Sequence, residues 1–512
     1  MDSLRRQWLL RAALATAAPW PRSGWGSTPP LREDPFALGV ASGDPTPDGV
    51  VLWTRLLPGA DAPPAALTVH WELAEDAHFR RPVQRGQAQA LPARGYSVHV
   101  ELQGLEPERW YHYRFRCGAA VSRTGRTRTA PAPGALPARL RLAFASCQRW
   151  EHGHYAAWGH VAAQAPDLVL FLGDYIYEYA SPRDTTGLAR VHGLRHARTL
   201  QDYRDRYALH KSDPQLQEAH AACPCSVTWD DHEVQNDWAG ALGREADPLA
   251  FLEQRLAAWQ AFGENMPLRA ARLAQGTQAL GLYRSLDWGR LARIHLLDTR
   301  QYRDWQACRA PGSSGAAGVH PDACPAWHEP QRTLLGPVQE QWLARQLARQ
   351  APCWSVLAQQ TLFAPRHYPS GLRSTDTWDG YPGARARLLQ ALERHPQRNT
   401  VLLGGDIHQN YVCRVHADPG DPASPVLASE FCGTSISSRA GTTQERLDAM
   451  ARHNPHVLLA RCAERGWGLA EITPRHWTAT LHAVDDPLRA DSGAQVLARF
   501  VVEDGRAGPQ PA

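Results

Sequence analysis

Reactive side chains follow several apolar segments in the C-terminal two thirds of the chain. A single Asp after a strand usually caps a helix or forms a turn, but five such positions in one region favour a shared site. These positions combine a thiol, carboxylates, imidazoles and a phenol: Cys147, Gly173-Asp174-x-x-Tyr177, Asp230-Asp231-His232-Glu233, Asp298-Thr299-Arg300 and Gly405-Asp406-Ile407-His408.

Metal binding accounts for these residue types together. Carboxylates that converge on one rim repel each other unless a positive charge lies between them, and a cation supplies that charge. Imidazole and thiolate ligands leave zinc and iron both open, whereas carboxylate-rich positions also suit calcium. A two-metal site activates water and clamps a phosphoryl group. The chain has no Gly-x-Ser-x-Gly elbow, so we expect direct attack by water rather than a serine nucleophile.

The segments between these positions predict a layered α/β domain. Apolar runs at 140–146, 168–173, 226–229, 292–297, 354–358 and 401–404 are typical of buried strands, and helical periodicity occurs at 154–164, 248–262, 337–350 and 384–393. Ligands of open α/β sheets bind beyond the carboxyl ends of the strands. We therefore expect a catalytic domain over residues 138–505, with the reactive side chains at one edge.

Residues 35–130 have a different pattern, which predicts an all-β domain. Short alternating segments at 50–55, 67–73, 96–102 and 111–117 are separated by Gly, Pro and Asp turns. Gly104-Leu105-Glu106-Pro107, followed by Tyr111, resembles the E–F corner of a fibronectin-like or Ig-like sandwich. We expect a small β-sandwich here, without a catalytic cluster.

Residues 1–30 have the pattern of an export signal. Arg5 and Arg6 precede Trp8 and an alanine-rich apolar stretch that is too short to span a bilayer. The arrangement resembles a twin-arginine signal, so we expect the twin-arginine export machinery as a partner and a periplasmic or secreted protein. Ten cysteines fit an oxidising compartment, and the loop between Cys308 and Cys324 favours a local disulfide. The pairing of the other cysteines stays open.

The composition of the 512 residues excludes several classes of protein. Hydrophobic residues make up 43% of the chain, which is enough for a large core and excludes global disorder. No run of 18 apolar residues occurs, so we expect no transmembrane anchor. Lys211 is the only lysine among 55 basic residues, and the arginines are scattered, so no nucleic-acid-binding signature is present. We expect a monomer.

Taken together, the motifs resemble those of the PhoD-like alkaline phosphatase family of the metallophosphoesterase superfamily. Gly173-Asp174-x-x-Tyr177 matches the GDxxY motif of the superfamily, and Asp230-Asp231-His232-Glu233 and Gly405-Asp406-Ile407-His408 stand where it has Gly-Asn-His and Gly-His-x-His motifs. Ser146-Cys147-Gln148 replaces the usual first Asp-x-His, and Trp378-Asp379-Gly380-Tyr381 is a further family mark. The resemblance covers nearly the whole chain.

The resemblance implies ferric iron and calcium as cofactors, with zinc not excluded from the residue types. The implied ligands are Cys147 and Tyr177 on iron, Asp174 between iron and calcium, Asp231 and Asn236 on calcium, and Asp406 and His408 at the rim. Asp230 is an alternative to Asp231 and Asn236, and Asp406 is favoured over His408.

The resemblance also implies the activity, which is hydrolysis of phosphate esters by metal-activated water. His232 matches a histidine that protonates the leaving group elsewhere in the superfamily, and here it takes that role or steers a neighbour. Arg300 is expected to contact a phosphate oxygen through its planar fork or to pair with Asp298. The alternative is phosphodiesterase or phospholipase D-like activity at the same site. An adhesion module without turnover and a chelator-insensitive serine hydrolase are more distant alternatives.

Overall fold

The computed structural model describes residues 34–59, 65–244, 247–273, 280–310, 312–313, 315–395 and 399–512. The expected export signal, residues 1–30, lies outside the described residues. Within the described part of the chain, no helix combines the length and apolar character that a membrane crossing requires.

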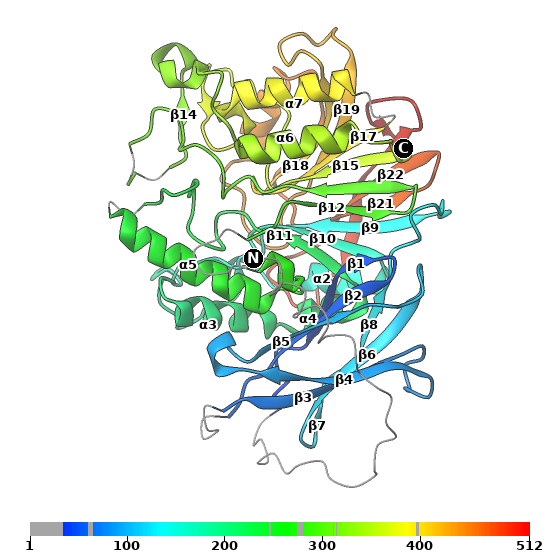
Figure 1. Ribbon diagram of the computed structural model, residues 1–512. Coiled ribbons are helices and arrows are strands. Elements are labelled where there is room, and N and C mark those ends of the chain that lie inside the picture. Colours follow the sequence, from blue (N-terminus) through cyan, green and yellow to red (C-terminus); the bar gives the residue numbers. More distant parts are fainter. Residues whose placement is uncertain are drawn as a thin grey trace, which may run out of the picture.

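A ten-stranded sheet forms the centre of the molecule (Figure 1). β10 pairs in parallel with β9 and with β11, as expected for strands buried on both faces. The order across the sheet is β24 (Gln510–Pro511), β23 (Ala494–Glu503), β22 (His476–Val484), β21 (Gly466–Ile472), β9 (Leu140–Ala145), β10 (Leu168–Leu172), β11 (Cys225–Thr228), β1 (Val40–Thr46), β2 (Gly49–Arg55) and β5 (Ser97–Leu102).

A seven-stranded sheet packs against the first, and their facing apolar side chains form one core that includes Phe144, Leu170, Ile294, Val356 and Phe431. β13, β15, β17 and β19 run parallel to one another. The order is β12 (Arg284–Trp288), β13 (Ala292–Leu296), β15 (Trp354–Ala358), β17 (Thr400–Gly404), β19 (Val426–Cys432), β18 (Asn410–His416) and β20 (Val457–Arg461). A small pair, β14 (Gly318–Val319) and β16 (Arg373–Ser374), stands apart.

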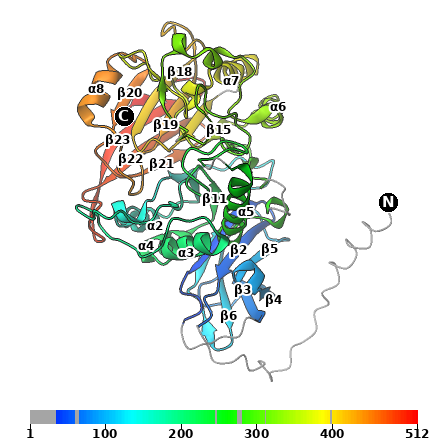
Figure 2. The same cartoon turned by 90° about the vertical axis from the view of Figure 1, so that its left-hand side faces the viewer.

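Helices cover the outer faces of the two sheets, which completes the layered α/β architecture that the sequence predicts (Figures 1 and 2). α2 (Ala156–Ala163), α3 (Leu200–Lys211), α4 (Pro214–Ala222) and α5 (Pro248–Asn265) pack on the first sheet, and α6 (Gly336–Leu347) and α7 (Pro382–Arg394) on the second. The remaining helices among the described residues are α8 (Gln444–Ala451) and the 3₁₀ turns η1 (Pro92–Arg94), η2 (Trp150–His152), η3 (Ala270–Arg272), η4 (Pro321–Ala323), η5 (Pro325–His328) and η6 (Trp378–Gly380).

Local signals explain where several of these helices begin. Thr199 and Asp202 form a reciprocal capping box at the start of α3. Asp213 and Asp247 cap α4 and α5, and in both helices a proline fills the first position, where no backbone N–H is needed.

The N-terminal region is built from two sheets, as predicted, but one of them is not separate. β3 (Leu67–Ala74), β4 (Pro82–Ala90), β6 (Trp110–Cys117), β7 (Ala120–Val121) and β8 (Gly125–Arg128) form a five-stranded sheet, whereas β1, β2 and β5 extend the central sheet. The continuity arises at Gly43, which pairs with Cys225 and where a Cβ would lie 2.6 Å from the Cys225 carbonyl oxygen. The predicted corner is present, because the Tyr111 hydroxyl accepts the Glu106 backbone N–H at 3.0 Å.

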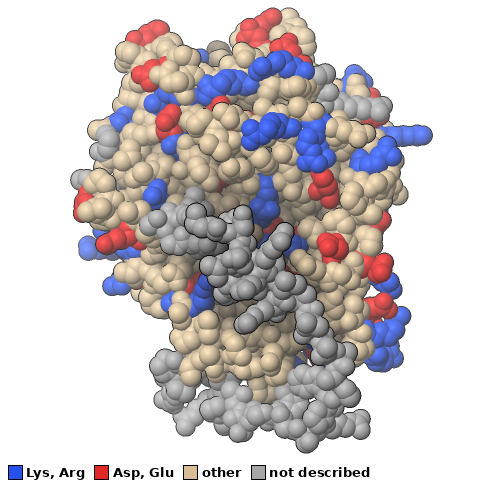
Figure 3. Space-filling model, viewed as in Figure 1, with Lys and Arg blue, Asp and Glu red and all other residues tan. Residues whose placement is uncertain are grey.

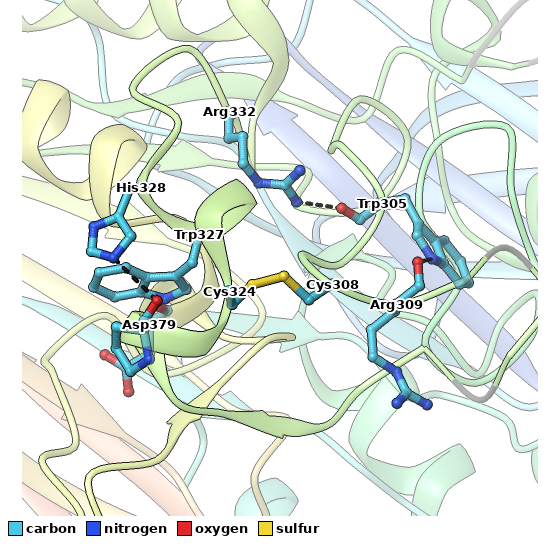
Figure 4. The surroundings of a disulfide bond; sticks show 9 residues. Trp305, Cys308, Arg309, Cys324, Trp327, His328, Arg332 and Asp379 are labelled. Carbon is cyan, nitrogen blue, oxygen red and sulfur yellow. Dashed lines mark hydrogen bonds between the residues drawn. A yellow bond between two sulfur atoms is a disulfide. The ribbon is translucent and has the colours of Figure 1, made fainter.

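The structure confirms the expected disulfide between Cys308 and Cys324 (Figure 4). It ties together a loop in which Gly315 packs against Asp237, the residue after the predicted ligand Asn236, with a hypothetical Cβ only 2.4 Å from the Asp237 Cβ. On the molecular face in Figure 3, basic and acidic side chains are interspersed.

Candidate metal centre

The carboxyl ends of four strands bring the predicted ligands together. Because β9, β10 and β11 run parallel and adjacent, the residues that follow them emerge at one edge of the central sheet. There the Cys147 backbone N–H donates to the carbonyl of Gly173 at 3.0 Å. β17 of the second sheet ends at the same place, since His408 Nε2 lies 3.1 Å from the Tyr177 hydroxyl oxygen.

Four of the predicted ligands have a left-handed backbone conformation. The φ angles are 60° at Cys147, 58° at Asp174, 65° at Asp406 and 55° at His408. A residue with a Cβ adopts this conformation at a cost of about 1–2 kcal/mol, so it persists only where the surrounding structure enforces it. Four residues with this strained backbone conformation at neighbouring strand ends are typical of a functional site.

Two sets of ligand atoms share Asp174. One ligand atom from each of Cys147, Asp174 and His408 lies within 4.8 Å of the other two, and the same holds for Asp174, Asp231 and His232. Tyr177 joins the first set, because its hydroxyl donates to Asp174 Oδ2 at 2.7 Å. A carboxylate common to both sets is in the position that a ligand bridging two cations requires.

Buried carboxylate oxygens without partners show that the residues fit a cation. Asp174 Oδ1, Asp230 Oδ2 and Asp231 Oδ1 are buried and accept no hydrogen bond. An unpartnered buried acceptor costs about 1–3 kcal/mol. Burial raises the pKa of Asp174 well above its usual range, and burial and the charge of Asp376 raise the pKa of Asp406 to about 7. A cation bound between these groups would satisfy the oxygens and keep the carboxylates ionised.

The Cys147 thiol and the Tyr177 hydroxyl also need a nearby positive charge before they can become anionic. Burial and the charge of Asp174 raise the pKa of the Cys147 thiol and of the Tyr177 hydroxyl. Both groups must lose a proton to become anionic ligands, so metal binding here is coupled to proton release. Ser438 links the Tyr177 hydroxyl to the Cys147 backbone, because its hydroxyl oxygen lies 2.8 Å from the Tyr177 oxygen and 3.0 Å from the Cys147 carbonyl.

Asp231 and Asn236, the residues predicted to bind calcium, each have a side-chain oxygen available. Its Oδ2 accepts the Asp237 backbone N–H at 2.7 Å, which leaves Oδ1 available. Asn236 is partly exposed, and its side-chain nitrogen donates to Asp237 Oδ2 at 2.6 Å. The Asn236 amide oxygen is therefore the atom left for a cation.

Arg300 is buried among carboxylates instead of facing solvent. Its side chain is 1% exposed and donates to Asp230 at 2.5 Å and to both oxygens of Asp376 at 2.9 Å. The sequence left open whether Arg300 contacts phosphate or pairs with Asp298. In the structure only its backbone N–H donates to Asp298, at 2.9 Å, so the side-chain charge balances Asp230 and Asp376.

His232 is oriented by a buried glutamate. Its Nδ1 lies 2.7 Å from Glu178 Oε2, and Glu178 Oε1 accepts the Asn236 backbone N–H at 2.9 Å. Since the carboxylate occupies Nδ1, Nε2 is the nitrogen available to the site. Burial lowers the pKa of His232, but the charges of Asp231 and Glu178 outweigh it and raise that pKa well above its usual range.

Sequence reasoning assigned no role to four residues of this arrangement: Glu178, Asp237, Asp376 and Ser438. Glu178 carries a signal that could have been used, because it is an acid directly after Tyr177 in the same segment. Asp376 and Ser438 lie in loops beyond β16 and β19 and have no spacing relation to the other ligands. Only the tertiary structure brings these two to the site.

Two packed sheets with helices outside, and two groups of candidate ligand atoms that share one carboxylate, are typical of hydrolases of the metallophosphoesterase type. The comparisons with known proteins are more specific. Residues 142–481 match the family model described as PhoD-like phosphatase, and residues 22–131 match the PhoD-like phosphatase N-terminal domain. The chain belongs to the PhoD-like phosphatase family.

Individual relatives agree with this membership. Alkaline phosphatase D of Bacillus subtilis (strain 168) is 42% identical over 496 residues, which are 94% of this chain and 83% of that protein. A solved structure titled "Structure of PhoD" superposes with a TM-score of 0.88 at 41% identity, covering 95% of this chain and 93% of that one. The chain is therefore a hydrolase that acts on phosphoric ester bonds.

Proposed function

We propose that this phosphoesterase is metal-dependent and that it hydrolyses phosphate esters at the edge formed by Cys147, Asp174 and Asp406. The observation that carries the proposal is the set of buried, unpartnered carboxylate oxygens on Asp174, Asp230 and Asp231. Because these atoms accept no hydrogen bond from the described residues, a bound positive charge would stabilise them in their ionised form.

Ferric iron and calcium are the proposed ions. Cys147 and Tyr177 offer a soft thiolate and a phenolate, which suit iron better than calcium. Asp231 and Asn236 offer oxygen atoms, which suit calcium. Asp174 lies in both sets, and His408 joins the first of them from the second sheet. Asp406 belongs to neither set, but its carboxyl interacts electrostatically with Asp231 and Asp174, and we propose it as a further ligand.

The side chains of the site divide the work of the reaction. Bound metal ions would supply positive charge to the phosphate oxygens and lower the pKa of a water molecule. His232, held at Nδ1 by Glu178, presents Nε2 as a proton donor to the leaving-group oxygen. Arg300 fixes Asp230 and Asp376 in place, and its charge outweighs burial to lower the pKa of the Asp376 carboxyl well below its usual range. We assign it this role in place of phosphate contact.

Elemental analysis of the purified protein, combined with ester hydrolysis assays before and after chelation, tests the proposal. We expect iron and calcium in the native protein, loss of turnover when they are removed, and recovery when they are returned. Asp174→Asn should lose both ions and nearly all turnover, because Asp174 belongs to both ligand sets. Full turnover in metal-free protein, or wild-type metal content in Asp174→Asn, would overturn the assignment.

We propose phosphate monoesters as the preferred substrates, in keeping with the name of the Bacillus subtilis relative. The alternative, hydrolysis of diesters including phospholipase D-like cleavage, uses the same groups. Comparing kcat/KM for a monoester and a diester that share one leaving group separates the two. A higher value for the diester would favour the alternative.

We also propose that the protein is exported by the twin-arginine machinery and acts as a monomer in the periplasm or outside the cell. The support is the Arg5-Arg6 pair and the apolar stretch that follows it. Replacing both arginines by lysine should leave active protein in the cytoplasm, as measured by cell fractionation. Unchanged export of that variant would contradict the twin-arginine route, and sedimentation of the purified protein tests the monomer.

A further inference from the structure

Arg149 is placed differently from Arg300 and Arg465, two other arginines beside the ligands. The side chain of Arg300 donates hydrogen bonds to carboxylates through all three of its nitrogens. Both terminal nitrogens of Arg465 donate to backbone carbonyls, and one of them also donates to the Ser435 hydroxyl. Arg149 instead uses only Nε, which donates to Glu151 Oε2 at 3.3 Å. Within the described part of the chain, its two terminal nitrogens make no hydrogen bond, and its side chain is 20% exposed.

The surroundings fix the Arg149 guanidinium over the metal ligands. Its central carbon lies 5.8 Å from the ring centre of Tyr177 and 5.2 Å from that of Tyr179, which are cation–π distances. The Tyr177 hydroxyl at the end of that ring is 2.7 Å from Asp174 Oδ2. The Arg149 guanidinium is therefore partly exposed beside Tyr177, whereas the Arg300 side chain is only 1% exposed.

A buried acid holds this arrangement. Glu151 is 1% exposed and also contacts His192 Nε2 at 3.1 Å and the Ser181 hydroxyl at 3.2 Å. These contacts outweigh the effect of burial and lower the pKa of Glu151 to about 2, so it is ionised. The Arg149 backbone is held as well, since its N–H donates to Ser438 Oγ at 3.1 Å and its carbonyl accepts from Ser437 Oγ at 2.7 Å.

We propose that Arg149 binds the phosphate group of the substrate through its two terminal nitrogens and gives the site its preference for monoesters. This inference rests on the proposed function, because it places the phosphate beside Cys147, Asp174 and Tyr177. A planar guanidinium pairs with two oxygens of a phosphate at once. A monoester dianion has three terminal oxygens and a second negative charge, whereas a diester has two terminal oxygens and a single charge. Arg149 therefore stabilises a bound monoester more than a bound diester.

The experiment compares Arg149→Ala and Arg149→Lys with the matched control Arg126→Ala. Arg126 also stacks on an aromatic ring, 3.5 Å from the ring centre of Trp110, but it belongs to the N-terminal β-sheet. Each variant is assayed on a monoester and a diester, for inhibition by inorganic phosphate, and for iron and calcium content.

Arg149→Ala should keep its metals, lose about 10- to 100-fold in kcat/KM for the monoester, lose less for the diester, and bind inorganic phosphate more weakly. Arg149→Lys should fall between it and the wild type, and added guanidinium should restore part of the monoester activity of Arg149→Ala. The inference would be overturned if Arg149→Ala lost its metals or lost kcat/KM equally on the monoester and the diester. A similar loss of kcat/KM in Arg126→Ala would overturn it as well. Failure of the proposed function looks different, because the wild type would then lack metals or resist chelation.

Discussion

Replacing Glu178 by glutamine tests how the site orients His232. Glu178 is fully buried and accepts from two donors, the His232 Nδ1–H at 2.7 Å and the Asn236 N–H at 2.9 Å. A glutamine has one acceptor oxygen, so its NH₂ group must face one of these donors. One buried donor is then unsatisfied, which costs about 1–3 kcal/mol, or about 5- to 150-fold in an equilibrium or rate constant.

We expect Glu178→Gln to lower kcat/KM within that range while the iron set around Cys147 keeps its metal. The assay is a double-mutant cycle with His232→Ala, with metal content measured for every variant. If Glu178 acts through His232, the double variant is no worse than His232→Ala alone. Glu430→Gln is the matched control, because Glu430 is also fully buried and accepts two backbone N–H groups, at 2.6 and 2.8 Å, away from the ligands. The reasoning would be refuted if the losses of kcat/KM in Glu178→Gln and His232→Ala added up in the double variant, or if Glu430→Gln lost as much kcat/KM as Glu178→Gln.

The remaining predictions concern the iron set, a buried amine and the disulfide. Cys147→Ser should lose iron and most turnover, whereas Cys117→Ser, at an equally buried thiol in the β-sandwich, should keep both; elemental analysis and ester assays check this. Lys211 lies 4.0 Å over the Trp53 ring without a hydrogen bond, and burial lowers its pKa from 10.5 to about 7. Between about pH 7 and 10 the unfolded chain then binds one more proton than the folded chain. The free energy of unfolding of the wild type should therefore rise with pH by about 1.4 kcal/mol per pH unit relative to that of Lys211→Met, as measured by denaturant unfolding. Parallel pH profiles of the two proteins would contradict this prediction. Replacing Cys308 and Cys324 by serine should destabilise the loop by about 3 kcal/mol and lower turnover, and unchanged activity would show that the loop does not support the site.

Much of the fold follows from local patterns. The apolar runs at 168–173 and 401–404 correspond to β10 and β17, because a strand buried on both faces requires uninterrupted apolar residues. Helix starts such as those at Pro214 and Pro248 are encoded by a capping aspartate and a following proline. The continuity of β1 with β11 has no such signal, since it is one contact between segments about 180 residues apart.

The sequence alone determined which side chains are available for chemistry, because the motifs after each strand already contain Cys147, Asp174, Tyr177, Asp231 and His408. It also determined that they share an edge, since parallel strands end together. Only the tertiary structure decided the neighbours of these groups. Arg300 pairs with Asp376 and Arg149 lies over the Tyr179 ring, and no spacing in the chain encodes that difference. The physical reason is that charge pairing depends on distances between loops from both sheets, which exist only after the sheets have packed.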